Sequence, residues 1–169
     1  WSEAQHNLLK EEREPEILFA DLSDTVLQLA NWGASDWSKM SWPTKPPEET
    51  FQKAEKLLKQ LGCLDHDGKI KAHGEGVLSL GIEPRLGHMV LMAKSFGLHS
   101  LALDLTAFLL EKEASSSFGG KSQEGLFNSD LCLVLEALHD FRKKGLKAVK
   151  NLGLHPGFVK GIDETSKKL

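Results

Sequence analysis

Residues 46–71, PPEETFQKAEKLLKQLGCLDHDGKIK, combine the clearest helix of the chain with an abrupt change of hydrophobic period. Pro47 suits the first helical position, and Gly62 suits the position just past the last turn. Apolar residues recur between them on one helical face: Phe51, Ala54, Leu57, Leu58 and Leu61. Asp67-Gly68 then stands between two apolar residues, which is the strongest short-range signal for a β-hairpin. We therefore predict a helix followed directly by a short hairpin.

Helical periodicity also occurs on both sides of this segment. Residues 14–33 predict one amphipathic helix with Asp21 as its N-cap and Gly33 as its stop, and residues 36–40 predict one short helical turn. Further helices are predicted where apolar residues recur at the same spacing: 72–81, 84–97, 98–109, 130–141 and 156–169. Three short helices followed by a small hairpin is the order of a winged-helix module. The later helices can bury their apolar faces only against one another, which predicts a helical bundle.

The predicted fold class is therefore mainly α. A winged-helix module with a short β-hairpin wing occupies residues 14–82, and a helical bundle occupies residues 83–169. A chain of 169 residues has room for one domain or for two small domains that share a core, and 40% apolar content is ordinary for a globular protein. Three tryptophans, Trp32, Trp37 and Trp42, would either stack on bases or pack within the first module or against a neighbour, and we expect packing.

The formal net charge of −3 gives no general attraction to nucleic acid or membrane, so anion binding requires a local group of Lys and Arg. Cys63 and Cys132 lack the spacing of a zinc site or a disulfide framework, and we expect both to be buried, reduced thiols. No apolar run is long enough to span a bilayer, and the sequence shows no signal peptide. These features predict a cytoplasmic protein without a membrane partner.

The stretch SSSFGGKSQ, residues 115–123, ends like a phosphate-binding P-loop. The first glycine of that motif is replaced by Ser115, and the preceding residues resemble the end of a helix rather than a buried strand. We therefore predict a flexible Ser/Gly loop and no nucleotide site. The histidines have no metal-ligand spacing and no serine-nucleophile motif occurs, so we predict no catalytic residue, metal site or cofactor site in this chain.

The stretch FRKKGLKAVK concentrates positive charge in an otherwise slightly acidic chain. Its cations are Arg142, Lys143, Lys144, Lys147 and Lys150. On one continuous helix, Lys143, Lys147 and Lys150 share a face, which would align three ammonium groups with a phosphate backbone. The alternative is a solvated helix end, at which the helix dipole favours cations.

The order EPEILFADLSDTVLQLANWGASD, then PPEETFQKAEKLLKQLGCLDHDGKIKAHGEGVLSLGIEPRLGHMVLMAK, resembles the helicase-associated region of DEAH-type ATP-dependent RNA helicases, most closely the bacterial HrpB group. The elements that carry the resemblance are Pro15-Glu16-Ile17, Pro46-Pro47, Leu61-Gly62-Cys63-Leu64 with Asp67-Gly68, Gly74 and Pro84-Arg85-Leu86. Residues 1–13 resemble the tail of a preceding motor domain, so we expect the chain to be a piece of a longer protein. The chain departs from the family at Thr44-Lys45, where Asp is common, and at Gly87, where Ala is frequent.

This resemblance implies an accessory region that has no catalytic activity of its own. In such helicases a winged-helix module and a helical "ratchet" bundle close an RNA channel beside two RecA-like motor domains, and they couple motor movement to translocation. ATP and Mg²⁺ would bind to motor domains upstream in the same chain, and this region would be a monomer that contacts single-stranded RNA. The phosphate contacts that we expect are Arg85, Arg142, Lys143, Lys144, Lys147 and Lys150. For Arg85, packing between the two modules is the alternative role.

Two functions of other classes stay open at this point. A free-standing winged-helix DNA-binding regulator would insert residues 47–61 into a major groove, but the mixed glutamates and lysines of that helix suit a phosphate-lined groove poorly. A protein-binding helical scaffold that touches no nucleic acid is compatible with the acidic net charge.

Overall fold

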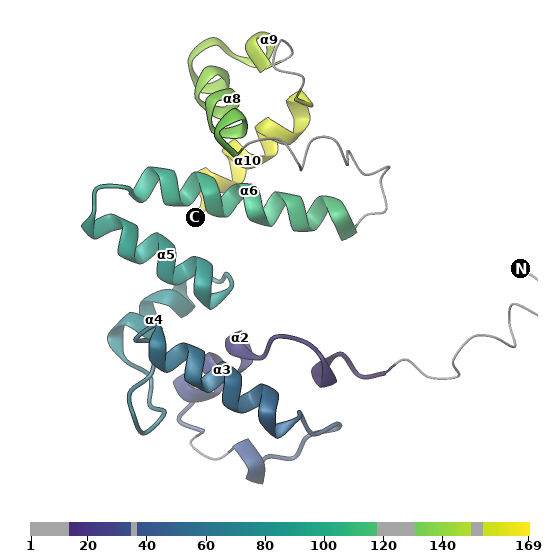
Figure 1. The fold of residues 1–169 in the computed structure, drawn as a ribbon, viewed down its shortest axis with the longest axis vertical. Helices are drawn as coiled ribbons and strands as arrows, with labels where there is room; N and C mark the ends of the chain where they lie inside the picture. Colours follow the sequence, from purple (N-terminus) through teal and green to yellow (C-terminus); the bar gives the residue numbers. More distant parts are fainter. Residues whose placement is uncertain (1–13, 35–36, 118–130, 150–153) are drawn as a thin grey trace, which may run out of the picture. The chain divides into compact units, whose positions relative to one another are not determined.

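The computed structural model describes residues 14–34, 37–117, 131–149 and 154–169 (Figure 1). The chain divides into two compact units, one that ends at Gly87 and one that runs from His88 to Leu169. Within the described residues every regular element is a helix, which confirms a mainly α fold, and none of these helices is long and apolar enough to cross a membrane. The predicted motor-domain tail and most of the predicted Ser/Gly loop, from residue 118 on, lie outside these ranges.

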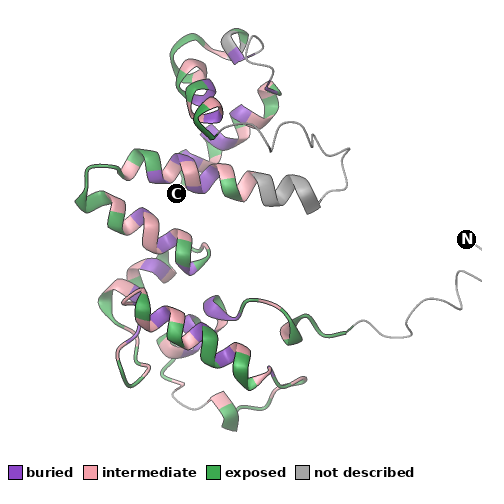
Figure 2. Cartoon of the chain, viewed as in Figure 1, coloured by how far each residue is buried: buried purple, intermediate pink, exposed green. Residues whose placement is uncertain are grey.

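The first unit is built on three α-helices that bury their apolar faces against one another. Its elements are η1 (Glu16–Leu18), α2 (Ser23–Asn31), η2 (Trp37–Lys39), α3 (Glu48–Gln60) and α4 (Ala72–Ser79). Helix α2 packs against both α3 and α4. Leu27 of α2, Leu58 of α3 and Val77 of α4 are fully buried. Figure 2 shows buried positions on each of these three helices. The helical spacing of apolar residues read from the sequence therefore defines the core of this unit.

The predicted β-hairpin wing is wrong in its strands, although its turn is present. Leu64 and Ile70 form an isolated antiparallel bridge, and the described residues contain no strand. The Asp65 carboxylate accepts hydrogen bonds from the backbone N–H groups of Asp67, at 2.9 Å, and Lys69, at 2.8 Å. The side chain of Asp65 thus binds amides within the turn itself, and Gly68 closes the turn with a φ of +79°. Because α4 begins at Ala72, little chain is left for a ladder.

The start of the first unit agrees with the sequence analysis in part. Residues 14–33 form η1 and α2 rather than one helix, and the N-cap of α2 is Leu22 instead of the predicted Asp21. The predicted short turn is η2, and Trp37 stacks on Phe51 with 4.1 Å between the ring centroids. The indole N–H of Trp42 donates to the carbonyl oxygen of Trp37 at 2.9 Å, so these two tryptophans pack within the unit as expected. Trp32, in contrast, is 73% exposed.

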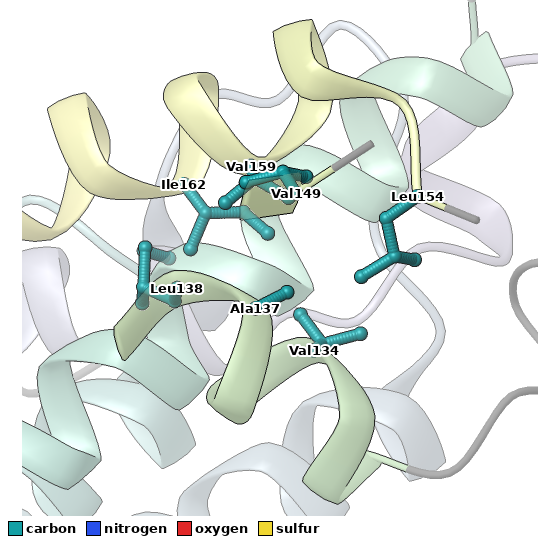
Figure 3. Packing of buried hydrophobic residues seen from close by; sticks show 8 residues of the cluster. Val134, Ala137, Leu138, Val149, Leu154, Val159 and Ile162 are labelled. Atoms are coloured by element: carbon teal, nitrogen blue, oxygen red, sulfur yellow. The ribbon is translucent and has the colours of Figure 1, made fainter. Parts of the chain in front are cut away.

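The second unit consists of helices around a separate apolar core. Helix α5 (Pro84–Ser95) runs across the division between the units, and α6 (His99–Ser117), α8 (Leu131–Lys144), α9 (Leu146–Val149) and α10 (Pro156–Lys168) follow. Helix α10 lies along α6 and α8, and α9 contacts α8 and α10. Their buried side chains form one cluster (Figure 3): Ala107, Val134, Ala137, Leu138, Val149, Leu154, Val159 and Ile162. The predicted opening of the last helix at Pro156 is confirmed.

The two cysteines differ, contrary to the expectation that both are buried. Cys63 is fully buried, and desolvation raises the pKa of its thiol. Cys132 is exposed and lies in the first turn of α8, two residues before the buried Val134. A step of two residues moves a side chain by about 200° around a helix, which explains why the two positions face opposite ways.

Candidate nucleic-acid interface

The basic cluster lies where α8 ends. Gly145 adopts a φ of +75°, and its N–H donates to the carbonyl oxygen of Phe141 at 2.8 Å, so the helix stops at Lys144 and α9 begins after one residue. The continuous helical face predicted for the cluster is therefore wrong within the described residues, since Lys143 lies on α8 and Lys147 on α9. A left-handed glycine is a common helix terminator, because it lacks the Cβ that disfavours this conformation in other residues. Lys150 lies outside the described residues.

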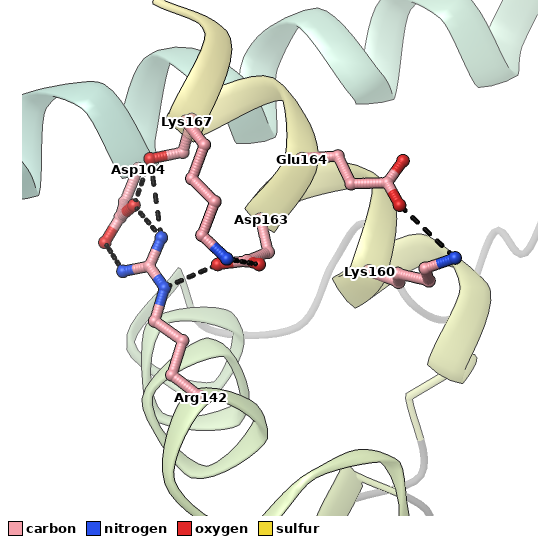
Figure 4. A network of polar contacts seen from close by, with 7 residues as sticks. Asp104, Arg142, Lys160, Asp163, Glu164 and Lys167 are labelled. Carbon is pink, nitrogen blue, oxygen red and sulfur yellow. Dashed lines mark hydrogen bonds and ion pairs between the residues drawn. The ribbon is translucent and has the colours of Figure 1, made fainter.

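Arg142 contacts two acidic residues that come from other helices (Figure 4). Its Nη1 and Nη2 donate to the two oxygens of Asp104 of α6, at 2.9 Å and 2.8 Å. Its Nε donates to Oδ1 of Asp163 of α10 at 2.7 Å. The hydroxyl of Ser166 donates to Asp104 Oδ1 at 2.6 Å, and Arg142 Nη2 lies 3.4 Å from the same hydroxyl. The planar guanidinium therefore joins α6, α8 and α10 through bidentate and charge-assisted hydrogen bonds.

The Arg142 network is electrically balanced. Lys167 of α10 pairs with the second oxygen of Asp163 at 2.5 Å, so two cations face two carboxylates. Burial alone would raise the pKa of Asp163, but hydrogen bonds from Lys167 and Arg142 outweigh it and hold this pKa below its usual value. The hydrogen bonds that Arg142 donates to Asp104 raise the pKa of Arg142, despite the opposing effect of burial. Both shifts favour the charged forms of Asp163 and Arg142.

The lysines beside Arg142 differ in what they contact. Lys144 pairs with Asp140 of the same helix at 3.0 Å. Lys143 and Lys147 are exposed, and within the described ranges they form no ion pair. Lys143 follows the buried Leu138 by five residues, which places it about 140° around α8 from the core side. Two ammonium groups are therefore available to an anion from solvent without loss of an ion-pair partner among the residues that the structure describes.

Arg85, the remaining predicted contact, belongs to the first unit. It lies in the first turn of α5, its side chain is 59% exposed, and its Nε is 3.7 Å from Glu83 Oε1. Its charge also contributes to the lowered pKa of Asp21, although burial and hydrogen bonds from Ser23 affect that pKa more strongly. Arg85 and the basic cluster are thus parts of different units.

Lys167 is a cation of this region that the sequence analysis missed. The spacing of Asp163 and Lys167 is that of an ordinary helical pair, and this local signal was available. The association of this pair with Arg142, in contrast, depends on how α8 and α10 pack. No group of three or more His, Cys, Asp or Glu side chains that could bind a metal occurs in the part of the chain that the structure describes.

The outer face of α3, which a DNA-binding regulator would present to a groove, is electrostatically mixed. Lys53 pairs with Glu49 and Lys59 pairs with Glu55, each at 2.7 Å. These ammonium groups already have anionic partners on the same helix, which disfavours this face as a phosphate-binding surface.

Comparisons with known proteins identify relatives of this chain. No protein-family model matches it. The chain is 39% identical over 98 residues to the ATP-dependent RNA helicase HrpB of Escherichia coli, a match that covers 58% of this chain and 12% of that protein. It is 29% identical over 109 residues to the probable ATP-dependent RNA helicase DHR2 of Saccharomyces cerevisiae, covering 64% of this chain and 15% of that protein. A putative ATP-dependent RNA helicase of Schizosaccharomyces pombe is 30% identical over 83 residues, covering 49% of this chain and 7% of that protein.

Solved structures agree with these relatives. A crystal structure of the E. coli DEAH/RHA helicase HrpB matches with a TM-score of 0.58 and 26% identity, over 91% of this chain and 18% of that chain. A second, of E. coli DExH-box NTPase HrpB, matches with a TM-score of 0.55 and 23% identity, over 98% of this chain and 20% of that chain. The resemblance stated from the sequence is therefore confirmed: the chain is homologous to a segment of HrpB, and it spans a fifth or less of each relative and structure named above.

Proposed function

We propose that this chain is the accessory region of an ATP-dependent RNA helicase, and that it closes the channel for single-stranded RNA and couples motor movement to translocation. In this proposal residues 14–82 are a winged-helix module and residues 83–169 a ratchet-like bundle. RecA-like motor domains upstream in the same chain would bind ATP and Mg²⁺, and this region would perform no catalysis by itself. The homology to HrpB, at 39% identity over 98 residues, is the observation that carries the proposal.

The proposed RNA contacts in the second unit are the lysines at the end of α8 and beyond. Lys143 and Lys147 are exposed and have no ion-pair partner among the described residues, so they would bind a phosphate without giving up an internal contact. Lys144 would first have to leave Asp140, and an exposed pair of this kind contributes only about 0.2–1 kcal/mol. Lys150 and Arg85 complete the proposed set, and Arg142 lies at the base of the cluster.

Cations that contact phosphates release condensed counterions, so their contribution to affinity falls as salt rises. For single-stranded nucleic acid, each neutralised phosphate adds about 0.7 to the slope of log affinity against log salt. Three lysines that each contact one phosphate would together account for a slope of about 2.

The test is a fluorescence anisotropy titration of labelled single-stranded RNA with the chain, at several salt concentrations. The K143A/K144A/K147A variant should bind more weakly at low salt and lose about 2 from the slope. A matched control is K53A/K56A/K59A on the outer face of α3, which changes the formal charge by the same amount, from −3 to −6. Equal affinities and slopes for the two triple variants would refute the proposed contacts, because net charge alone would then explain the loss.

The same titration separates the other two functions. Tighter binding to duplex DNA than to single-stranded RNA would favour the DNA-binding regulator, and wild-type protein without measurable affinity for either would favour the protein-binding scaffold. We also propose that the protein is cytoplasmic and monomeric. Sedimentation equilibrium of the purified protein would test the monomeric state.

A further inference from the structure

We propose that Arg142 is a positioning residue, which fixes the cationic end of α8 to α6 and α10, and that it is not itself an RNA contact. This inference rests on the proposed RNA-binding role of the neighbouring lysines. It assigns different tasks to adjacent residues of one basic stretch: Arg142 holds the bundle together, and Lys143 offers its charge to solvent.

The hydrogen bonds of the guanidinium support this assignment. All three nitrogens of Arg142 already donate to carboxylates, two to Asp104 and one to Asp163, at 2.7–2.9 Å. The Arg142 side chain is only 32% exposed, and its two partners are more buried, at 12% and 8% for Asp104 and Asp163. A phosphate that captured this guanidinium would leave the buried Asp104 without its counter-ion, which is strongly unfavourable, whereas Asp163 would keep Lys167.

The balance of charge leads to the same conclusion. Arg142 and Lys167 offset Asp104 and Asp163, so the network as a whole presents no net charge to an approaching polyanion. Lys143, one residue further on, has no such partner within the described residues. The attraction of this surface for phosphate therefore comes from the lysines.

The position of Arg142 in the chain suits an anchor. It lies in the last turn of α8, three residues before the left-handed Gly145. Its partners are 38 and 21 residues away in the sequence, one on α6 and one on α10. Contacts to two other helices at this point restrain the direction in which α8 ends, and hence where Lys143 is presented.

The experiment compares R142Q with the double variant D104N/R142Q, in which the charge removed from Arg142 is matched by the charge removed from Asp104. R142Q alone should lower the thermal unfolding temperature and weaken single-stranded RNA binding several-fold, because it leaves Asp104 buried and uncompensated. The double variant should recover most of the unfolding temperature and bind RNA within twofold of wild type, with an unchanged salt slope.

Two outcomes would overturn the proposal. One is a stable double variant whose slope of log affinity against log salt is about 0.7 smaller than that of wild type, because this difference would show that Arg142 contacts one phosphate. The other is an R142Q variant as stable as wild type. A measurement on the unaltered protein guards against variants that do not fold: the Nε–H resonance of Arg142, assigned by its loss in R142K, should keep its chemical shift during RNA titration, whereas a direct contact would move it.

Failure of the proposed function is distinguishable from failure of this inference. If wild-type protein binds no RNA, the proposed function fails, whereas the anchoring role of Arg142 is still decided by the stability of R142Q and its recovery in D104N/R142Q.

Discussion

Gly74 lies in the first turn of α4, and replacing it with alanine tests how closely this helix packs on the turn before it. An alanine Cβ at this position would lie 2.4 Å from the carbonyl oxygen of Cys63 and 2.9 Å from Cγ1 of Ile70. The nearer of these two atoms belongs to the backbone. The carbonyl oxygen of Cys63 also accepts a hydrogen bond from the N–H of Lys71 at 2.9 Å, so it cannot move away without losing that bond. The glycine is therefore required by close approach of the backbone, since its φ is not in the left-handed region.

Two opposing effects determine how much the unfolding free energy changes in G74A. Alanine gains up to about 1 kcal/mol over glycine from helix propensity. Forcing an extra methyl group into a packed interior costs about 1–3 kcal/mol or more, and a backbone obstacle places this site at the upper end of that range. With about 3 kcal/mol of steric cost and about 1 kcal/mol of propensity gain, we expect G74A to lose about 2 kcal/mol. In a unit of this size that loss lowers the unfolding temperature by about 8–16 °C.

Tryptophan fluorescence is the appropriate assay, because all four tryptophans of the chain lie at or before residue 42 and therefore report on the first unit. The matched control is G161A in α10, where the new Cβ would meet only the end of the flexible Glu111 side chain, at 2.9 Å. Followed by circular dichroism of the whole chain, G161A should change stability by less than about 1 kcal/mol. A G74A protein that unfolds at the wild-type temperature would refute the steric reasoning.

Three further predictions concern the second unit and the thiols. Leu138 is 1% exposed, so L138A should lose about 2–5 kcal/mol of unfolding free energy in urea denaturation, and a loss below 1 kcal/mol would contradict the packing of the core. The pKa of Asp163 is lower in the folded protein than its unfolded value near 3.8, so this carboxylate stabilises the fold above that value and the stabilisation is lost as pH falls through the folded pKa. Acid titration followed by circular dichroism should therefore show a steeper loss of stability below about pH 4 in wild type than in D163N. With Ellman's reagent, Cys132 should react rapidly in the native protein and Cys63 only after denaturation, because burial protects Cys63 and raises its pKa; two equally fast thiols would exclude this arrangement.

The helices of this chain are predictable because each carries its own signal. Pro156 and the apolar residues after it predict α10, and Phe51, Ala54 and Leu58 predict the buried face of α3. The end of α8 was also readable locally, since Gly145 interrupts the basic stretch. The spacing of the lysines points the other way, because it is compatible with one continuous helical face.

Other features depend on contacts that no local pattern encodes. The hairpin signal at Asp67-Gly68 correctly predicts a turn, but the capture of two turn amides by the Asp65 side chain and the early start of α4 leave a single bridge. Arg142 looked like its lysine neighbours, because nothing in FRKKGLKAVK indicates that carboxylates from residues 104 and 163 meet it.

The Arg142 network also bears on how an acidic chain would bind RNA. The sequence holds 24 acidic and 21 basic residues, and that count alone predicts no attraction to a polyanion. Asp104 and Asp163 are nevertheless directed into the bundle, where Arg142 and Lys167 neutralise them. The lysines beside them are exposed to solvent without such partners among the described residues, so the charge that a strand of RNA would meet at the end of α8 is positive although the chain as a whole is not. Within about 10 Å, the Debye length at ordinary salt, this local surplus outweighs the distant acidic residues.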